Sequence, residues 1–187
     1  MNPLQHLLYK IAKGIEQFTH WIGHLTSWLT FIMVLVVFFV VIMRYLFNVG
    51  SIELQESIIY LHGMVFLLAA AFTLQQDKHV RVDVFYSKWN DRRRAWIDLT
   101  GTILLLFPVC IYIFSMSLDF VLLSWKINES SGEAGGLPGL YLLKSLIILM
   151  PALLMLQGFA WIIFRILFLS GHLESPYKRN HQAGVGQ

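Results

Sequence analysis

Four long stretches of apolar residues divide this chain, and polar or charged positions separate each stretch from the next. An α-helix rises about 1.5 Å per residue, so about 20 apolar residues are enough to cross a hydrocarbon core about 30 Å thick. The pattern therefore predicts an all-α integral membrane protein, with a single membrane domain over residues 1–187. We expect its four transmembrane helices over residues 25–46, 52–76, 96–125 and 140–169.

The second stretch shows most clearly where a helix begins and ends. Ser51 is a suitable N-cap, and Glu53 and Glu56 lie in the first turns, where the helix dipole favours negative charge. The sequence DKHVRVD follows at residues 77–83, and it carries too many charges to remain in lipid. A complete helix is therefore expected between these two boundaries.

Residues 3–22 place apolar side chains at helical spacing, with polar side chains on the opposite face. Asn2 as N-cap and Pro3 at the first helical position mark a start. We expect an N-terminal amphipathic helix in the membrane interface, separate from the span that begins at Leu25. A helix that packs on a partner is the alternative. A cleavable signal peptide is disfavoured, because no small-residue cleavage site follows.

Charge predicts the orientation of the helices. The connection over residues 77–94 holds six basic and three acidic residues, whereas the one over residues 126–139 holds one basic and two acidic residues. The positive-inside rule places the first connection, both termini and the polar tail over residues 170–187 in the cytoplasm. The triple arginine is read as part of this anchor, so no nucleic-acid partner is expected.

Composition narrows the class further. The chain is 57% hydrophobic and 13% charged, with a mean hydropathy of +0.63, which excludes a soluble globular domain. The single cysteine, Cys110, excludes an intramolecular disulfide. We find no phosphate-binding glycine motif, no nucleophile elbow and no His or Cys pair at metal spacing. The sequence therefore predicts no catalytic, cofactor-binding or metal site, and no enzyme.

Two ion pairs are expected near the outer ends of the helices. Arg44 lies a few residues before Glu53 and Glu56, so it is expected to pair with one of them. The alternative is that the Arg44 guanidinium is solvated by itself at the interface. Asp119 and Lys144 are expected at similar depth on the third and fourth helices, which predicts a second pair. Lys144 snorkelling alone to the interface is the alternative.

His62 lies near the middle of the second helix, where a protonatable group is unusual. We expect a neutral imidazole hydrogen-bonded to a partner helix. Haem ligation is the alternative, but it requires a second histidine at the same depth, and the other histidines fall at helix ends or in loops. Gly63 and the alanines at 69–71 permit close helix packing.

Three further positions concern helix shape and charge. Pro108 and Pro151 lie inside the third and fourth helices and predict a kink in each. Arg165 is expected to snorkel to the interface at the inner end of the fourth helix.

The first hairpin carries a recognisable combination of motifs. Arg44-Tyr45-Leu46-Phe47-Asn48 is followed by Glu53 and Glu56, and then by a helix that ends in Asp77-Lys78-His79-Val80-Arg81-Val82-Asp83. In this order the motifs resemble the small membrane subunit, the DctQ-like or Q subunit, of tripartite ATP-independent periplasmic (TRAP) transporters. The resemblance extends over nearly the whole chain, including the Gly-Leu-Pro entry to the fourth helix.

The resemblance implies a role in an assembly of the bacterial inner membrane. A soluble periplasmic protein captures an organic acid, a large polytopic M subunit carries it inward coupled to sodium, and the Q subunit braces the M scaffold. Sodium is then expected on the M subunit, with no cofactor on this chain. The expected partners are the M subunit in a stable complex, the periplasmic binding protein in a transient one, and membrane lipid.

Residue roles follow from the resemblance position by position. Three of these residues are expected to close the outer hairpin, namely Arg44, Glu53 and Glu56. Three more are expected to shape the cytoplasmic connection, namely His79, Arg81 and Asp83. Two rival functions remain open, which are a membrane anchor subunit of an oxidoreductase and a stand-alone four-helix exporter. The substrate remains open too, because specificity is expected to reside in the other subunits.

Overall fold

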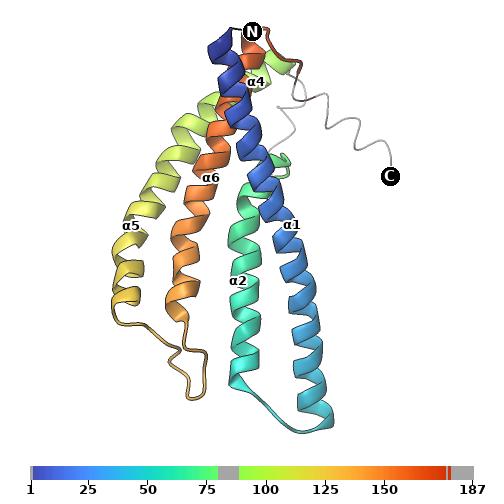
Figure 1. Cartoon of the computed structure of the whole chain (residues 1–187), viewed down its shortest axis with the longest axis vertical. Helices are drawn as coiled ribbons and strands as arrows, with labels where there is room; N and C mark the ends of the chain where they lie inside the picture. Colours follow the sequence, from blue (N-terminus) through green and yellow to red (C-terminus); the bar gives the residue numbers. More distant parts are fainter. Residues whose placement is uncertain (1, 80–88, 176, 178–187) are drawn as a thin grey trace.

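The part of the chain that the structure describes folds into four long helical rods that lie side by side (Figure 1). The computed structural model describes residues 2–79, 89–175 and 177. Each rod is long and apolar enough to cross a membrane, which confirms the predicted all-α fold with four candidate spans. The rods comprise α1 (Pro3–Leu46), α2 (Ile52–Gln75), the continuous series α4 (Asp91–Gly101), η1 (Thr102–Leu106) and α5 (Phe107–Lys126), and α6 (Leu140–Leu169).

The two ends of the bundle differ in what they contain (Figure 1). The connection between α1 and α2 and the loop between α5 and α6 lie at one end, which we call the hairpin end. The start of α1, the whole of α4 and the last turns of α6 lie at the other, which we call the N-terminal end.

The first rod differs from the sequence prediction, because α1 runs without a break from Pro3 to Leu46. Its start is as expected, with Asn2 as N-cap and Pro3 in the first turn. No proline interrupts the region around Gly23 where a break was expected, and the hydroxyls of Thr26 and Ser27 donate to the Gly23 carbonyl oxygen at 2.8 and 3.0 Å. The expected separate interfacial helix is therefore wrong: the amphipathic segment is the first half of a single rod.

The bounds of α2 and α6 agree closely with the sequence. The Ser51 hydroxyl accepts a hydrogen bond from the backbone N–H of Leu54 at 3.3 Å, which makes Ser51 the N-cap of α2. The last residue of α2 is Gln75, one position before the expected end, and α6 continues through Pro151 as one helix.

The third rod starts earlier than expected and contains a π-helical segment. Asn90 caps α4, because its side-chain oxygen accepts from the backbone N–H of Arg93 at 3.0 Å. In η1 the Phe107 N–H bonds the Thr102 carbonyl, five residues back. Pro108 follows directly and has no N–H to donate, so the widened turn accommodates the proline where a kink was expected.

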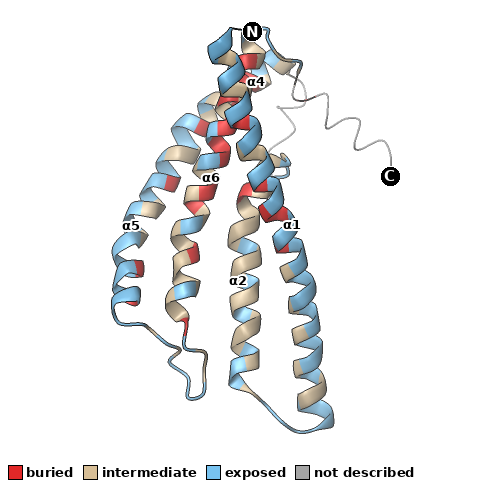
Figure 2. Cartoon of the chain, viewed as in Figure 1, coloured by how far each residue is buried: buried red, intermediate tan, exposed pale blue. Residues whose placement is uncertain are grey.

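The core gathers around α6, which contacts α1, α2 and α5. In the most apolar 18-residue stretch of α6, half of the residues are buried, against 6% in the corresponding stretch of α1. Figure 2 shows the buried residues concentrated on α6 and toward the N-terminal end of the bundle. One cluster joins α1 to the end of α6 and a second joins α1, α2 and α6. They consist of Ala12, Ala160, Ile163 and Leu167, and of Ile22, Ala71 and Leu153.

Candidate functional site

Glu56 ties α2 to the loop between α5 and α6 at the hairpin end. One carboxylate oxygen accepts a short hydrogen bond from the Ser131 hydroxyl, and the other accepts from the Leu137 backbone N–H at 2.6 Å. The Ser131 N–H in turn donates to the Leu137 carbonyl oxygen at 3.2 Å, which closes the loop on itself. A single carboxylate on α2 therefore orders a loop more than 70 positions later in the chain.

The same contact explains a glycine in the loop. A Cβ at Gly136 would lie 2.8 Å from a carboxylate oxygen of Glu56 and 2.5 Å from the side chain of Ser131. Contacts below 3.0 Å force a displacement, so a larger residue at this position would push the loop away from α2. The Gly136 backbone is thus part of the Glu56 contact.

Lys144 on α6 pairs with Glu129, where the sequence predicted a pair with Asp119. Its ammonium lies 2.5 Å from a Glu129 carboxylate oxygen and 4.0 Å from the centre of the Phe120 ring. Asp119 is exposed on α5, and no ion pair joins it to Lys144 within the described residues. The hydrogen bond from Lys144 lowers the pKa of Glu129 below its usual value.

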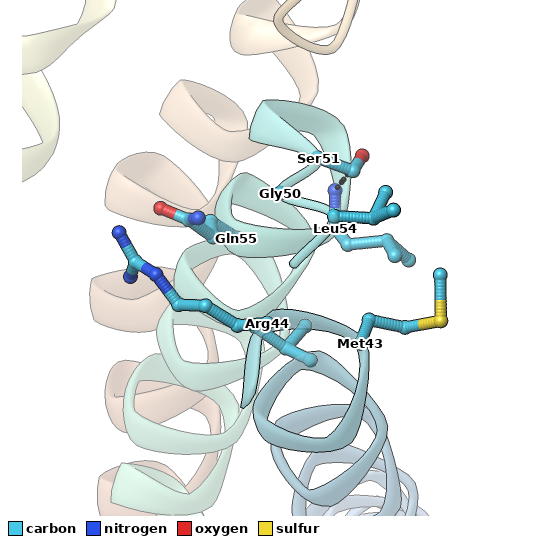
Figure 3. A pocket seen from close by; sticks show the side chains of 8 residues that line it. Met43, Arg44, Gly50, Ser51, Leu54 and Gln55 are labelled. Atoms are coloured by element: carbon cyan, nitrogen blue, oxygen red, sulfur yellow. Dashed lines mark hydrogen bonds between the residues drawn. The ribbon is translucent and has the colours of Figure 1, made fainter. Parts of the chain in front are cut away.

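Arg44 does not form its expected pair either. Within the described part of the chain, no ion pair joins Arg44 to Glu53 or Glu56. Glu56 faces the α5–α6 loop, whereas Arg44 is exposed at the end of α1 beside Gln55 (Figure 3). The sequence predicted the correct end of the bundle for these charged residues. It did not predict the directions in which their side chains point around the helix axes.

A small crevice adjoins Arg44, at the junction of α1 and α2 (Figure 3). Its walls are mainly apolar, and Ser51 and Leu54 belong to the first turn of α2 and its cap. The crevice is lined by Val40, Met43, Arg44, Val49, Gly50, Ser51, Leu54 and Gln55.

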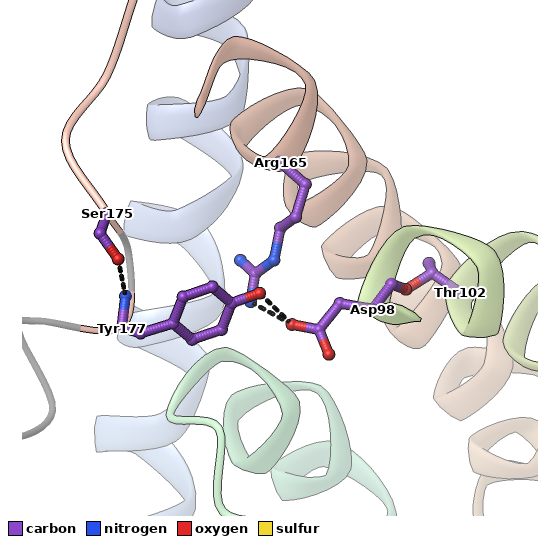
Figure 4. Close-up of polar contacts among 5 residues, drawn as sticks. All are labelled: Asp98, Thr102, Arg165, Ser175 and Tyr177. Atoms are coloured by element: carbon purple, nitrogen blue, oxygen red, sulfur yellow. Dashed lines mark hydrogen bonds and ion pairs between the residues drawn. The ribbon is translucent and has the colours of Figure 1, made fainter. Parts of the chain in front are cut away.

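At the N-terminal end, a buried ion pair joins α4 to α6 (Figure 4). An Arg165 guanidinium nitrogen lies 3.1 Å from Asp98 Oδ2, and the two side chains are only 7% and 5% exposed. The Tyr177 hydroxyl donates to the same carboxylate oxygen at 2.7 Å. Arg165 therefore does not snorkel to the interface as expected, because the Asp98 carboxylate pairs with it inside the protein.

Further contacts enclose this pair. The Arg165 guanidinium lies 4.2 Å from the centre of the Trp161 ring, one turn earlier on α6. The Ser175 hydroxyl donates to a carboxylate oxygen of Asp91 at 2.5 Å, so the segment after α6 returns to the first turn of α4. This cluster was not predicted from the sequence. The signal that could have found it is the presence of an acid and a base at the same end of two successive apolar helices.

His62 is exposed on α2 and lies on the ring of Phe66, with the ring centres 6.3 Å apart and the planes 19° apart. Gly63 faces α6, and a Cβ at this position would lie 2.8 Å from the Leu143 side chain. Gly63 thus lies against the Leu143 side chain of α6. Ala71, the last of the three alanines, is 1% exposed between α1 and α6.

The remaining expected positions lie at the two ends of α2. Glu53 is exposed in the first turn. His79 places Nε2 3.3 Å from the Ala70 carbonyl oxygen, so its ring returns to the last turns of the helix. Arg81 and Asp83 fall outside the described residues.

The contacts at both ends are of a kind that holds helices and loops in place. Over residues 2–79, 89–175 and 177, no group of three or more His, Cys, Asp or Glu side chains is arranged to hold a metal ion. Glu56 instead accepts from a loop backbone N–H, and Arg165 and Tyr177 both donate to Asp98. This arrangement fixes the relative positions of the rods.

Comparisons with known proteins connect this bundle to one family. No curated protein and no solved structure matched the chain. The family model described as "Tripartite ATP-independent periplasmic transporters, DctQ component" matches residues 33–167, which includes part of every rod. That match confirms the resemblance seen in the hairpin motifs, and the chain therefore belongs to the DctQ family, the small permease component of TRAP transporters.

Proposed function

We propose that this chain braces the large M subunit of a TRAP transporter during sodium-coupled uptake of an organic acid. The observation that carries the proposal is the family match over residues 33–167. The contacts of Glu56 and Arg165 support it, because they join the rods at opposite ends of the bundle. A bundle held at both ends is suited to act as a fixed support for a moving neighbour.

The proposed orientation follows from charge. The basic residues between α2 and α4, together with Arg92, Arg93 and Arg94, favour a cytoplasmic N-terminal end in a bacterial inner membrane. The hairpin end then faces the periplasm. The loop that Glu56 holds in place is available there for brief contact with a substrate-loaded binding protein.

Sodium and substrate are assigned to the M subunit in this proposal, and the chain works without a cofactor of its own. Its part is structural, so it is not an enzyme. Sialic acid, dicarboxylates and keto acids are all candidate substrates, because the binding protein and the M subunit select among them.

Reconstitution into proteoliposomes tests this function. The chain, its M subunit and its binding protein would be combined, and uptake of labelled organic acids measured with and without an inward sodium gradient. Uptake that requires all three proteins and the gradient is expected. Uptake by this chain alone would support the exporter instead, and a Soret absorbance band in the purified protein would support an oxidoreductase anchor.

A further inference from the structure

One face of α2 carries polar side chains that no other described element covers. Four residues at spacings of four, three and four positions lie on the same side of the helix and are all exposed. Ile59 is 60% and Phe66 is 70% exposed. This α2 stripe consists of Gln55, Ile59, His62 and Phe66.

Because it contains His62, this stripe is not suited to face lipid. It is the eleventh residue of α2, about 15 Å from the start of the helix and therefore near the middle of a hydrocarbon core about 30 Å thick. No hydrogen bond joins its ring to another described residue, and its contact is the stack on Phe66. Ionisable residues at this depth nearly always face protein or water, because lipid tails offer no hydrogen bond.

The outer half of α1 shows what a lipid-facing surface of this protein looks like. Residues 31–41 are all apolar, and Phe31, Val34 and Phe38 are each more than half exposed. That face needs no polar partner and can contact acyl chains directly. The α2 stripe differs from it in offering hydrogen-bonding groups at the same depth.

The polar surface continues to the hairpin end. Figure 3 shows the Arg44 guanidinium and the Gln55 amide on the same side of the α1–α2 hairpin, and both side chains are exposed. Glu56, one of the two acids expected to pair with Arg44, is bonded to the α5–α6 loop. Arg44 is thus available to an acceptor outside this chain.

We propose that the α2 stripe is the docking face for one transmembrane helix of the M subunit. This inference rests on the proposed function and adds to it the surface by which the two proteins meet. The docked helix supplies a hydrogen-bonding side chain opposite His62 and a carboxylate or backbone carbonyl near Arg44 and Gln55. Ile59 and Phe66 fill the apolar part of the contact. A phospholipid could satisfy Arg44 at the interface but not His62 at mid-membrane.

Site-specific photo-crosslinking in the assembled transporter tests the assignment. A photoreactive phenylalanine analogue would replace Phe66 in one variant and Phe38 in a control. Both side chains are exposed, at 70% and 64%, and both lie within membrane-spanning segments. After illumination of membranes that contain all three transporter proteins, the expected product from position 66 is an adduct whose crosslink maps to a transmembrane helix of the M subunit. Position 38 is expected to give lipid adducts.

Other products overturn the assignment. Lipid adducts or a second copy of this chain at position 66 would exclude the M subunit from the α2 stripe. If the M subunit still co-purifies with the chain in that case, the supporting role survives and only the docking face is wrong. If the M subunit does not co-purify at all, the proposed function itself fails.

Substitutions at His62 give a second, independent test. His62→Leu suits lipid better than histidine does, so the chain should still insert and fold, while recovery of the M subunit falls by about tenfold because a buried partner group loses its hydrogen bond. His62→Gln keeps hydrogen-bonding capacity and should restore much of the recovery. Phe38→Leu is the matched control and should leave recovery unchanged. Equal recovery with His62→Leu and the control would contradict the docking face.

Discussion

Arg165 on α6 lies 3.1 Å from Asp98 on α4, and both side chains are almost completely buried. Because the Tyr177 hydroxyl donates to the same carboxylate oxygen, the pair joins three segments of the chain at the N-terminal end. A buried pair of this kind is costly to break, since the remaining charge stays buried after the ion pair is lost.

Removing one member of that pair is expected to destabilise the bundle strongly. Arg165→Leu should lower the free energy of unfolding by about 3–5 kcal/mol, because Asp98 is left buried opposite an apolar side chain. The double variant Asp98→Leu/Arg165→Leu should recover much of that loss. Unfolding in mixed micelles, followed by circular dichroism, measures both values.

Arg93→Gln serves as the matched control, because Arg93 is exposed on the same helix as Asp98. Its effect should stay within about 0.5 kcal/mol. A loss for Arg165→Leu no larger than that of the control would show that the ion pair does not hold α4 to α6.

Glu56 is expected to act through the α5–α6 loop and not through Arg44. In a double-mutant cycle, Glu56→Ala and Ser131→Ala should show a coupling of about 0.5–3 kcal/mol, because the two side chains share a hydrogen bond. Glu56→Ala and Arg44→Gln should be additive within about 0.5 kcal/mol. The opposite ranking of the two couplings would restore the pairing expected from sequence.

The Lys144–Glu129 pair predicts a dependence of stability on acid pH. Because the folded pKa of Glu129 is lowered, its contribution is complete above the ordinary value of 4.5 and is lost as the pH falls through the lowered folded value. The stability difference between the wild type and Lys144→Gln should therefore be constant near neutral pH and shrink in acid. Thermal unfolding from pH 3 to 7, in steps of about 0.5 pH unit, measures it. A difference that stays constant throughout would exclude this pair as its source.

Two glycines in α1 are expected to respond oppositely to alanine. A Cβ at Gly23 would lie 2.4 Å from the Phe72 ring, whereas nothing lies within 4 Å of one at Gly14. Gly23→Ala should cost about 1–3 kcal/mol through overpacking. Gly14→Ala should stabilise the protein by about 0.5–1 kcal/mol, since alanine restricts the unfolded chain. Equal effects in unfolding experiments would mean that Phe72 does not pack on Gly23.

The extent of each helix was more predictable from sequence than the direction of its side chains. Ser51 and the charges after Gln75 determine the ends of α2 locally, so the sequence pattern located them. The break expected near Gly23 is absent. Glycine is small enough for Phe72 to pack directly on it while α1 stays helical. Such a contact between two helices cannot be read from either sequence stretch alone.

Charge partners were harder to predict, because similar depth in the membrane does not determine rotation about the helix axis. Depth alone matched Lys144 to Asp119, but Asp119 is exposed and the partner of Lys144 is a loop acid, Glu129. The same reasoning would have found Asp98 and Arg165, which do face each other. Rotation is determined by packing among the rods, and periodicity describes each rod only by itself.

Native mass spectrometry of the affinity-tagged chain, purified in mild detergent from membranes that also contain its M subunit and binding protein, tests the central claim most directly. A stable complex of this chain with one M subunit is predicted, with the periplasmic protein present only when substrate is added. Recovery of the chain alone, or with a flavin or iron–sulfur protein in place of the M subunit, would contradict the proposed supporting role.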